Sequence, residues 1–88
     1  MGKLKQGTYP LKISTNEYPD FSDRLRIAMQ LRNCSIEELA STSFLTRSTI
    51  SCYRTGQRSP NVDTLRLLAQ NLDVSADFLI GLNEYIYI

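Results

Sequence analysis

TRSTISCYRTG, residues 46–56, is the stretch from which the fold of this chain can be worked out. It reads as a short helix whose only large apolar residues, Ile50 and Tyr53, lie three apart on one stripe. Its other positions carry short hydrogen-bonding side chains and two guanidinium groups, where an ordinary solvated helix carries Glu/Lys pairs. A half-exposed helix of this kind suits a DNA groove, because base edges present both donors and acceptors there.

A second short helix is predicted immediately upstream, at SIEELASTS, residues 35–43. Ser35 followed three residues later by Glu38 is a capping box, which marks a helix start. Thr46 is expected to cap the next helix, and Gly56 to end it, because the residue after a helix often takes a positive φ. Two short helices joined by a tight turn predict a helix-turn-helix.

Three further helices are predicted around this pair. Apolar residues at helical spacing indicate an amphipathic helix over residues 21–32, capped by Asp20. A fourth helix is expected to begin after Asn61, and a short fifth helix to run from Ser75 to Gly81. The buried face of the fourth helix is predicted to consist of Val62, Leu65, Leu68, Ala69 and Leu72.

The two ends of the chain differ in kind from the helical domain predicted at residues 20–82. Residues 1–19 form an N-terminal extension that contains the extended stretch TYPLKIS, and its first seven residues are expected to be a disordered tail. The C-terminal tail, residues 83–88, ends in YIYI, which has the composition of a strand. We expect these two segments to pair, within one chain or across a dimer, and the core to lie upstream of Asn83.

Length and composition predict one small globular domain. The chain has 88 residues, of which 42% are hydrophobic, and no apolar run approaches the roughly 18 residues of a membrane helix. No apolar run follows the N-terminal lysines as a signal peptide requires, so we expect a cytoplasmic protein. Two cysteines, no histidine and no glycine-rich phosphate loop leave no candidate metal site, cofactor site or catalytic centre.

The charge of the chain is unevenly distributed, although its net value is only +1. Residues 24–66 hold seven arginines against three acidic residues, which leaves this stretch at +4. A fold that brings Arg47, Arg54 and Arg58 together would have one basic face, as nucleic-acid binding requires. Seven scattered and solvated arginines are equally compatible with the charge alone.

Residues 21–82 resemble the phage-repressor-like helix-turn-helix family of the Xre and Cro type. The matching pieces, in order, are RLR at 24–26, SIEELA at 35–40, LTRSTISCYRTGQRSP at 45–60, TLRLLAQNLDVS at 64–75 and DFLIGL at 77–82. The resemblance implies an all-α, five-helix repressor-like domain. In such a domain the helix from Arg47 lies in the major groove, and the helix from Ile36 crosses the phosphate backbone above it.

The resemblance also implies roles for individual side chains. The base-reading positions are Arg47, Ser48 and Cys52, with Thr49 and Ser51 at the margin of that face. The phosphate-binding positions are Ser35, Thr46, Arg54, Thr55 and Arg58. An arginine can donate two parallel hydrogen bonds to guanine O6 and N7, a contact worth about 1–3 kcal/mol of discrimination. Ser35 and Thr46 would also cap helices in a protein that binds no DNA.

Two departures from the family pattern need a structural answer. Phe44 stands where the turn usually has glycine, so either it adopts a left-handed conformation at a cost of about 1 kcal/mol or the turn is built differently. Met29 and Arg54 stand where many members have an arginine and a glutamate that form a buried ion pair. Because both partners are changed, no buried charge is left unpaired. Arg54 is then free to point towards DNA or to pair with Glu37 or Glu38.

These features predict a sequence-specific, double-stranded DNA-binding transcriptional regulator, a repressor of the phage or prophage type. One small module binds weakly, so a homodimer on a two-fold site is expected. The apolar residues available for its dimer surface are Phe78, Leu82, Tyr85, Ile86, Tyr87 and Ile88. The alternative is a protein-binding module, such as an antitoxin or an adaptor, which the apolar C-terminus favours.

Overall fold

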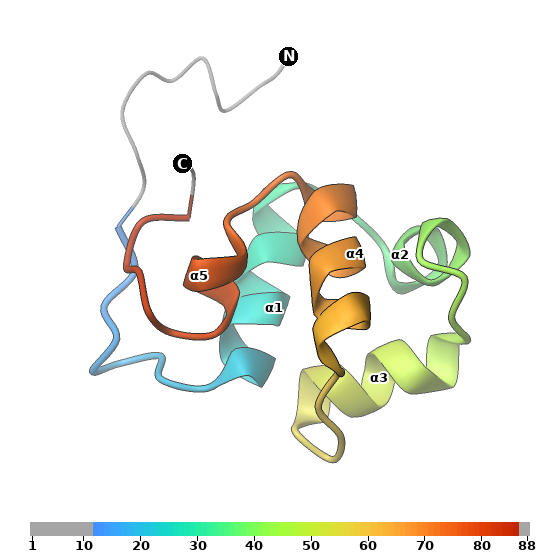
Figure 1. The fold of residues 1–88 in the computed structure, drawn as a ribbon, viewed down its shortest axis with the longest axis horizontal. Helices are drawn as coiled ribbons and strands as arrows, with labels where there is room; N and C mark the ends of the chain where they lie inside the picture. The colour runs from blue at the N-terminus through green and yellow to red at the C-terminus, as the bar shows by residue number, and fades with distance from the viewer. Residues whose placement is uncertain (1–11, 87–88) are drawn as a thin grey trace.

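The computed structural model describes residues 12–86 of the chain, and within that range it contains five α-helices (Figure 1). They are α1 (Phe21–Leu31), α2 (Ile36–Thr42), α3 (Arg47–Thr55), α4 (Val62–Leu72) and α5 (Ala76–Leu79). The prediction of an all-α, five-helix fold is confirmed, with every helix within about two residues of its expected bounds. In Figure 1, α2 and α3 occupy one side of the molecule, while α5 and the two ends of the described range, near residues 12 and 86, occupy the other.

Side-chain caps fix the starts of four helices, because each supplies an acceptor for a backbone N–H that has no partner within the helix. The capping box is present: Ser35 Oγ accepts from Glu38 N at 3.1 Å, and Glu38 Oε1 accepts from Ser35 N at 2.9 Å. Thr46, Asn61 and Ser75 accept in the same way from the residue three positions on. Gly56 ends α3 with a φ of 82°, as expected.

The start of α1 departs from this pattern. Asp20 occupies the N-cap position, but its side chain makes no capping hydrogen bond. Its backbone carbonyl instead accepts from Arg24 N at 3.1 Å, the ordinary first bond of a helix. Asp20 is therefore the N-cap residue of α1, as predicted, but its side chain contributes no capping hydrogen bond.

The core lies where the apolar stripes of the five helices meet. Its buried hydrophobic residues are Leu25, Ala28, Met29, Leu39, Ala40, Ile50, Tyr53, Leu68, Ala69, Leu72, Val74, Phe78, Leu79 and Ile86. Val62 was expected among them but is 71% exposed. It is the first residue of α4, and this helix reaches the core only one turn later, at half-buried Leu65.

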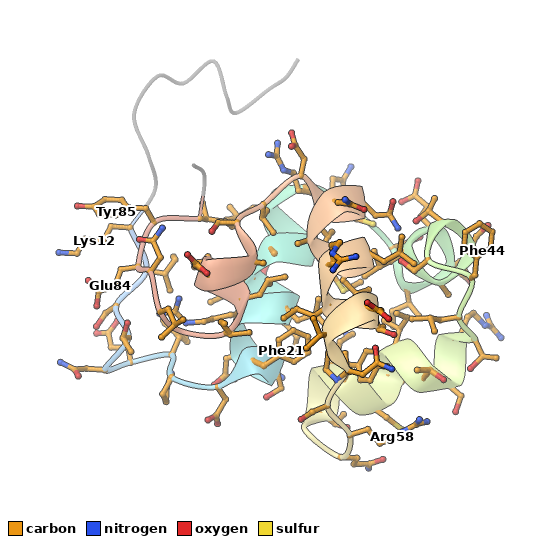
Figure 2. All side chains as sticks on the ribbon, in the orientation of Figure 1. Lys12, Phe21, Phe44, Arg58, Glu84 and Tyr85 are labelled. Atoms are coloured by element: carbon orange, nitrogen blue, oxygen red, sulfur yellow. The ribbon has the colours of Figure 1, made fainter. Side chains whose placement is uncertain are left out.

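Phe44 lies in the turn between α2 and α3, where the sequence allowed either a left-handed residue or a different turn. Its φ is 57°, so it adopts the left-handed conformation, and its ring is 88% exposed and points away from the molecule (Figure 2). The turn is anchored from α4, where Asn71 Nδ2 donates to Thr42 O at 3.1 Å and to Ser43 Oγ at 2.9 Å. These contacts hold α2 and α3 in one orientation although the turn carries a strained residue.

The two ends of the described chain pair with each other within one molecule, as one of the two alternatives predicted. Lys12 and Tyr85 form an antiparallel bridge, and Ile13 N donates to Glu84 O at 2.8 Å. Glu84 Oε2 also accepts from Thr15 N at 2.9 Å, and Glu84 Oε1 lies 3.7 Å from Lys12 Nζ (Figure 2). The remainder of both predicted segments, residues 8–11 and 87–88, lies outside the described residues.

Arg24 of α1 joins these ends to the helices, and we call residues 12–19 and 83–86 together with Arg24 the terminal clasp. The side chain of Arg24 is fully buried. Its guanidinium donates to the carbonyls of Tyr18 (2.7 Å), Phe78 (2.8 Å), Asn83 (2.9 Å) and Ile13 (3.3 Å) and to Thr15 Oγ1 (3.1 Å). It also lies 4.7 Å from the centre of the Phe78 ring. One buried cation thereby binds segments from both ends of the described range.

The terminal clasp corrects the expectation that the core lies upstream of Asn83. Ile86 is fully buried within the core, and its carbonyl accepts from Ser75 N at 3.0 Å. Successive side chains of the extended tail point in opposite directions, so Ile86 is buried while its neighbour Tyr85 is 41% exposed. The last described residues are therefore part of the folded domain.

Candidate nucleic-acid interface

The position of α3 follows from its two apolar residues. Ile50 and Tyr53 are buried against α1 and α2, and the Tyr53 ring meets the Phe21 ring edge-on at 6.3 Å between centroids. Because these two residues face inward, the residues that open the helix on its other side face solvent. The exposed residues there are Arg47, Ser48 and Ser51, three of the five predicted base-reading positions.

These exposed side chains border a shallow hollow between the starts of α2 and α3. The hollow has a volume of about 500 Å³ and is lined by Ile36, Glu37, Arg47, Ser48 and Ser51. Arg47 Nη1 donates to Glu37 Oε2 at 3.1 Å across it. Glu37 was not predicted to belong to this surface. Its only signal in the sequence is its place in the first turn of the helix expected to lie above α3.

The other polar groups at the start of α3 are occupied by the helix itself. Thr46 Oγ1 accepts from Thr49 N at 3.1 Å and lies 2.9 Å from Thr49 Oγ1. Ser35 is engaged in its capping box at the start of α2. The capping roles of Ser35 and Thr46 are thus present, and both residues are exposed, so their phosphate-binding roles stay predictions.

The C-terminal half of α3 offers fewer free donors than the N-terminal half. Cys52 is half-buried, and its thiol donates to Gln57 Oε1 at 3.4 Å. The hydroxyl of Thr55 donates to the carbonyl of Cys52 at 3.3 Å. The side chains that remain available for reading bases are therefore concentrated in the first turn and a half of the helix.

Both cysteines are free thiols. Burial raises the pKa of the Cys34 thiol above its ordinary value, and the negative charge of Glu38 raises it further. A raised pKa keeps Cys34 protonated and weakly reactive.

Arg54 is less exposed than Arg47 and Arg58. Its side chain is half-buried, and its Nη1 lies 3.5 Å from Met29 Sδ, at the contact between α1 and α3. It forms no ion pair with Glu37 or Glu38, which corrects that expectation, whereas the predicted contact of Arg54 with a DNA phosphate stays a prediction. Met29 and Arg54, which stand where many family members have an arginine and a glutamate, are still in contact, but neither carries a carboxylate.

Among the remaining arginines, Arg26, Arg32 and Arg66 contact other groups of the protein. Arg26 binds Asp23 and the carbonyl of Arg54, and Arg66 lies 3.9 Å from Asp63. Arg32 donates to the carbonyls of Leu72 and Asp73. Arg58 is exposed in the loop after α3 and makes no ion pair with any residue in 12–86 (Figure 2). Arg47 opens α3 and Arg58 follows its end, and both residues are exposed.

The residues predicted for dimerisation differ in their exposure to solvent. Phe78 and Ile86 are fully buried within the chain, which excludes them from an exposed surface. Leu82 is 76% exposed and Tyr85 is 41% exposed, whereas Tyr87 and Ile88 lie outside the described residues.

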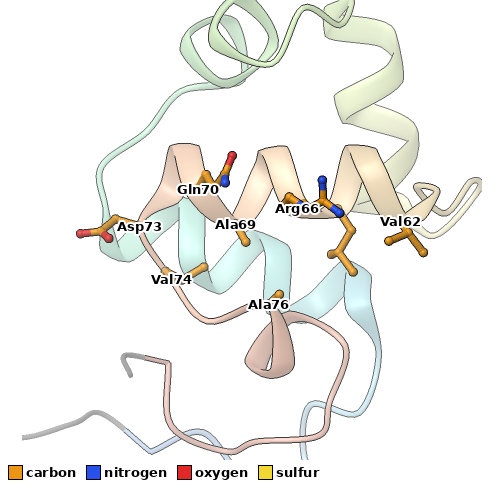
Figure 3. A pocket seen from close by; sticks show the side chains of 8 residues that line it. Val62, Arg66, Ala69, Gln70, Asp73, Val74 and Ala76 are labelled. Atoms are coloured by element: carbon orange, nitrogen blue, oxygen red, sulfur yellow. The ribbon is translucent and has the colours of Figure 1, made fainter.

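A second hollow, of about 450 Å³, lies along α4 and reaches Ala76 of α5 (Figure 3). Its lining is Val62, Leu65, Arg66, Ala69, Gln70, Asp73, Val74 and Ala76.

Among residues 12–86, every helix is too short or too polar to span a bilayer. No group of three or more histidine, cysteine or acidic side chains is placed there to hold a metal ion.

Comparison with known proteins gives consistent matches. The helix-turn-helix family model matches residues 25–79. An uncharacterized HTH-type transcriptional regulator, YobD of Bacillus subtilis (strain 168), is 30% identical over 64 residues, or 73% of this chain. The chain spans 57% of the length of that curated relative.

Two solved structures share the fold. The restriction-modification controller protein C.AhdI from Aeromonas hydrophila is 34% identical, with a TM-score of 0.64 over 67% of this chain and 89% of that one. The P22 c2 repressor protein, solved in complex with a synthetic operator, is 20% identical. Its TM-score is 0.68 over 73% of this chain and 97% of the repressor chain, a likeness of fold.

Proposed function

Since the chain belongs to the helix-turn-helix family, we propose that it binds double-stranded DNA in a sequence-specific manner and regulates transcription. The observation that carries the proposal is the exposed surface of the first turn and a half of α3. Arg47, Ser48 and Ser51 are exposed together there, on a helix whose other side is fixed by Ile50 and Tyr53. A rigid helix that presents a guanidinium and two hydroxyls is suited to reading base edges in the major groove.

In the proposed complex each polar group has a distinct task. Arg47 donates to guanine O6 and N7, and Ser48 and Ser51 bond to neighbouring base edges or sugars. The backbone N–H groups at the starts of α2 and α3 and the hydroxyls of Ser35 and Thr46 face phosphates. Arg58 contacts the backbone from its loop, because it has charge and reach but no rigid approach to a base.

We further propose that the protein acts as a homodimeric repressor of the phage or prophage type in the cytoplasm. It carries out no catalysis and needs no cofactor in this role. Two-fold related copies would place two α3 helices on a palindromic site and so supply the affinity that one small module lacks. Exposed Ile80, Leu82 and Tyr85 supply an apolar surface for self-association.

A protein-binding module is the second candidate. The apolar hollow along α4 and the exposed side chains of Val62 and Leu82 favour it. Such a module would have affinity for a partner protein and little for DNA.

Selection of bound duplexes from a random pool, followed by binding measurements across a range of salt concentrations, tests the proposal. The expected result is an enriched two-fold motif and a logarithmic salt slope of about −0.9 per phosphate contacted. Arg58→Ala should lower the magnitude of that slope by about one unit on every duplex. No enriched motif together with a flat slope would favour the protein-binding module.

A further inference from the structure

We infer that Glu37 is a positioning residue that sets the base specificity of Arg47, an inference that rests on the proposed DNA-binding function. The two side chains come from different helices and meet over the hollow between α2 and α3. Arg47 Nη1 lies 3.1 Å from Glu37 Oε2, and each side chain is 69% exposed. Glu37 is the single carboxylate among the residues that line this hollow.

The ion pair is not needed to hold the two helices together. Exposed ion pairs contribute little to folding, because water screens them and two long side chains must be ordered. The helices are already joined by the buried residues Leu39 and Ile50 and by the anchoring of their turn from Asn71. The neighbouring Glu38 is occupied with Ser35 N in the capping box, so Glu37 alone is available to Arg47.

The geometry leaves Arg47 ready to read a base. A guanidinium carries five N–H donors in one plane, and Glu37 accepts from Nη1 only. The other donors remain available for the two acceptors that guanine presents in the major groove. A flexible side chain that is already held loses less conformational freedom on binding, which is the advantage of preorganisation.

The carboxylate also acts by repulsion. Glu37 carries only acceptors when ionised, so it opposes phosphate oxygens and the O6 or O4 acceptors of a wrong base nearby. It can accept from the amino group of cytosine or adenine next to the guanine. Glu37 should therefore weaken binding to random DNA while it strengthens discrimination at the position that Arg47 contacts.

Glu37→Gln is the test, and Asp63→Asn is its matched control. Both substitutions remove one negative charge from an exposed pair with an arginine, but Asp63 pairs with Arg66 on α4, away from the hollow. Affinities are measured for the selected site, for that site with the guanine replaced, and for random duplex. Glu37→Gln should bind random duplex more tightly and lose discrimination at the guanine by about tenfold. Asp63→Asn should keep discrimination within about twofold of the parent protein.

A double-mutant cycle shows whether Glu37 acts through Arg47. In the Arg47→Ala background, Glu37→Gln should change discrimination at that position by less than about twofold. Unchanged discrimination in the single variant, or an equal loss in both backgrounds, would overturn the inference and leave the proposed function standing. A parent protein with no sequence preference would remove the proposed function as well. Thermal unfolding of each variant confirms that the affinities compare folded proteins.

Discussion

Two arginines in opposite regions of the molecule show how differently one side chain is used. Arg24, in the terminal clasp, is fully buried and surrounded by four carbonyls, a hydroxyl and a ring. Arg47, at the start of α3, is 69% exposed and meets a single carboxylate. The comparison separates the cation that holds the fold together from the cation that is proposed to recognise a ligand.

The physical basis of the contrast is solvation. A buried charge is tolerated only when hydrogen bonds replace its water, and bonds to a charged group are worth about 1.5–3 kcal/mol each. Arg24 achieves this without an ion pair to any residue in 12–86. An exposed pair such as Arg47–Glu37 adds only about 0–1 kcal/mol. We therefore expect variants of the clasp to change stability and variants of the α3 surface to change binding.

The largest effect is expected for Arg24→Met. The substitution keeps an unbranched apolar stem but removes every donor, so the carbonyls of Tyr18, Phe78 and Asn83 lose their partner. The free energy of unfolding should fall by about 3–5 kcal/mol, as when one partner of a buried charged contact is removed. Urea unfolding followed by circular dichroism measures it. Arg66→Met, at an exposed residue of α4, is the control, with an expected change in unfolding free energy within about 0.5 kcal/mol. Equal effects would erase the contrast.

Ile86→Ala tests the second element of the clasp. Ile86 is fully buried among core residues, so removing its side chain should cost about 2–5 kcal/mol of unfolding free energy. Leu82→Ala, at a residue that is 76% exposed, serves as the control and should leave stability nearly unchanged. If Ile86→Ala is as stable as the control, the tail does not belong to the core.

Arg47→Ala tests the exposed arginine, whose loss should change DNA binding and not folding stability. It should cost about 1–3 kcal/mol of binding free energy on the selected site and much less on random duplex, because only the specific complex uses the bidentate contact. The unfolding midpoint should stay that of the parent protein, in contrast to Arg24→Met. Fluorescence anisotropy on the two duplexes measures the difference. Equal losses on both would make Arg47 a phosphate contact.

The smallest expected effect is the pH dependence of the clasp. Hydrogen bonds from the Thr15 backbone N–H and hydroxyl, and then the charge of Lys12, hold the pKa of Glu84 below its ordinary value. Its stabilising contribution is thus present above the pKa of the unfolded chain and is lost as pH falls through the folded pKa. Glu84→Gln should flatten the acid side of the stability profile measured by urea unfolding at a series of pH values. Glu17→Gln, at an exposed residue without an ion pair in the described range, should leave that profile unchanged.

The five helices and the polar character of α3 could be predicted from residue spacing alone. These features depend on local signals. Ser35 and Glu38 lie three residues apart, and the Thr46 hydroxyl accepts a hydrogen bond from the backbone N–H of Thr49. Ile50 and Tyr53 lie on the same face of α3. Interactions within one helical turn can be read directly from spacing. The DNA contacts inferred from the same pattern stay predictions.

Which polar and apolar groups are buried depends on contacts between distant parts of the chain. The partners of Arg24 lie between 6 and 59 residues away, and Ile86 reaches the core from the opposite end of the chain. The sequence allows two conformations for the turn at Phe44, and in the structure this turn is held by Asn71 of α4. The ion pair between Glu37 and Arg47 joins two different helices. Burial of a charge or an end segment depends on groups that meet only after folding, so no local spacing in the sequence specifies it.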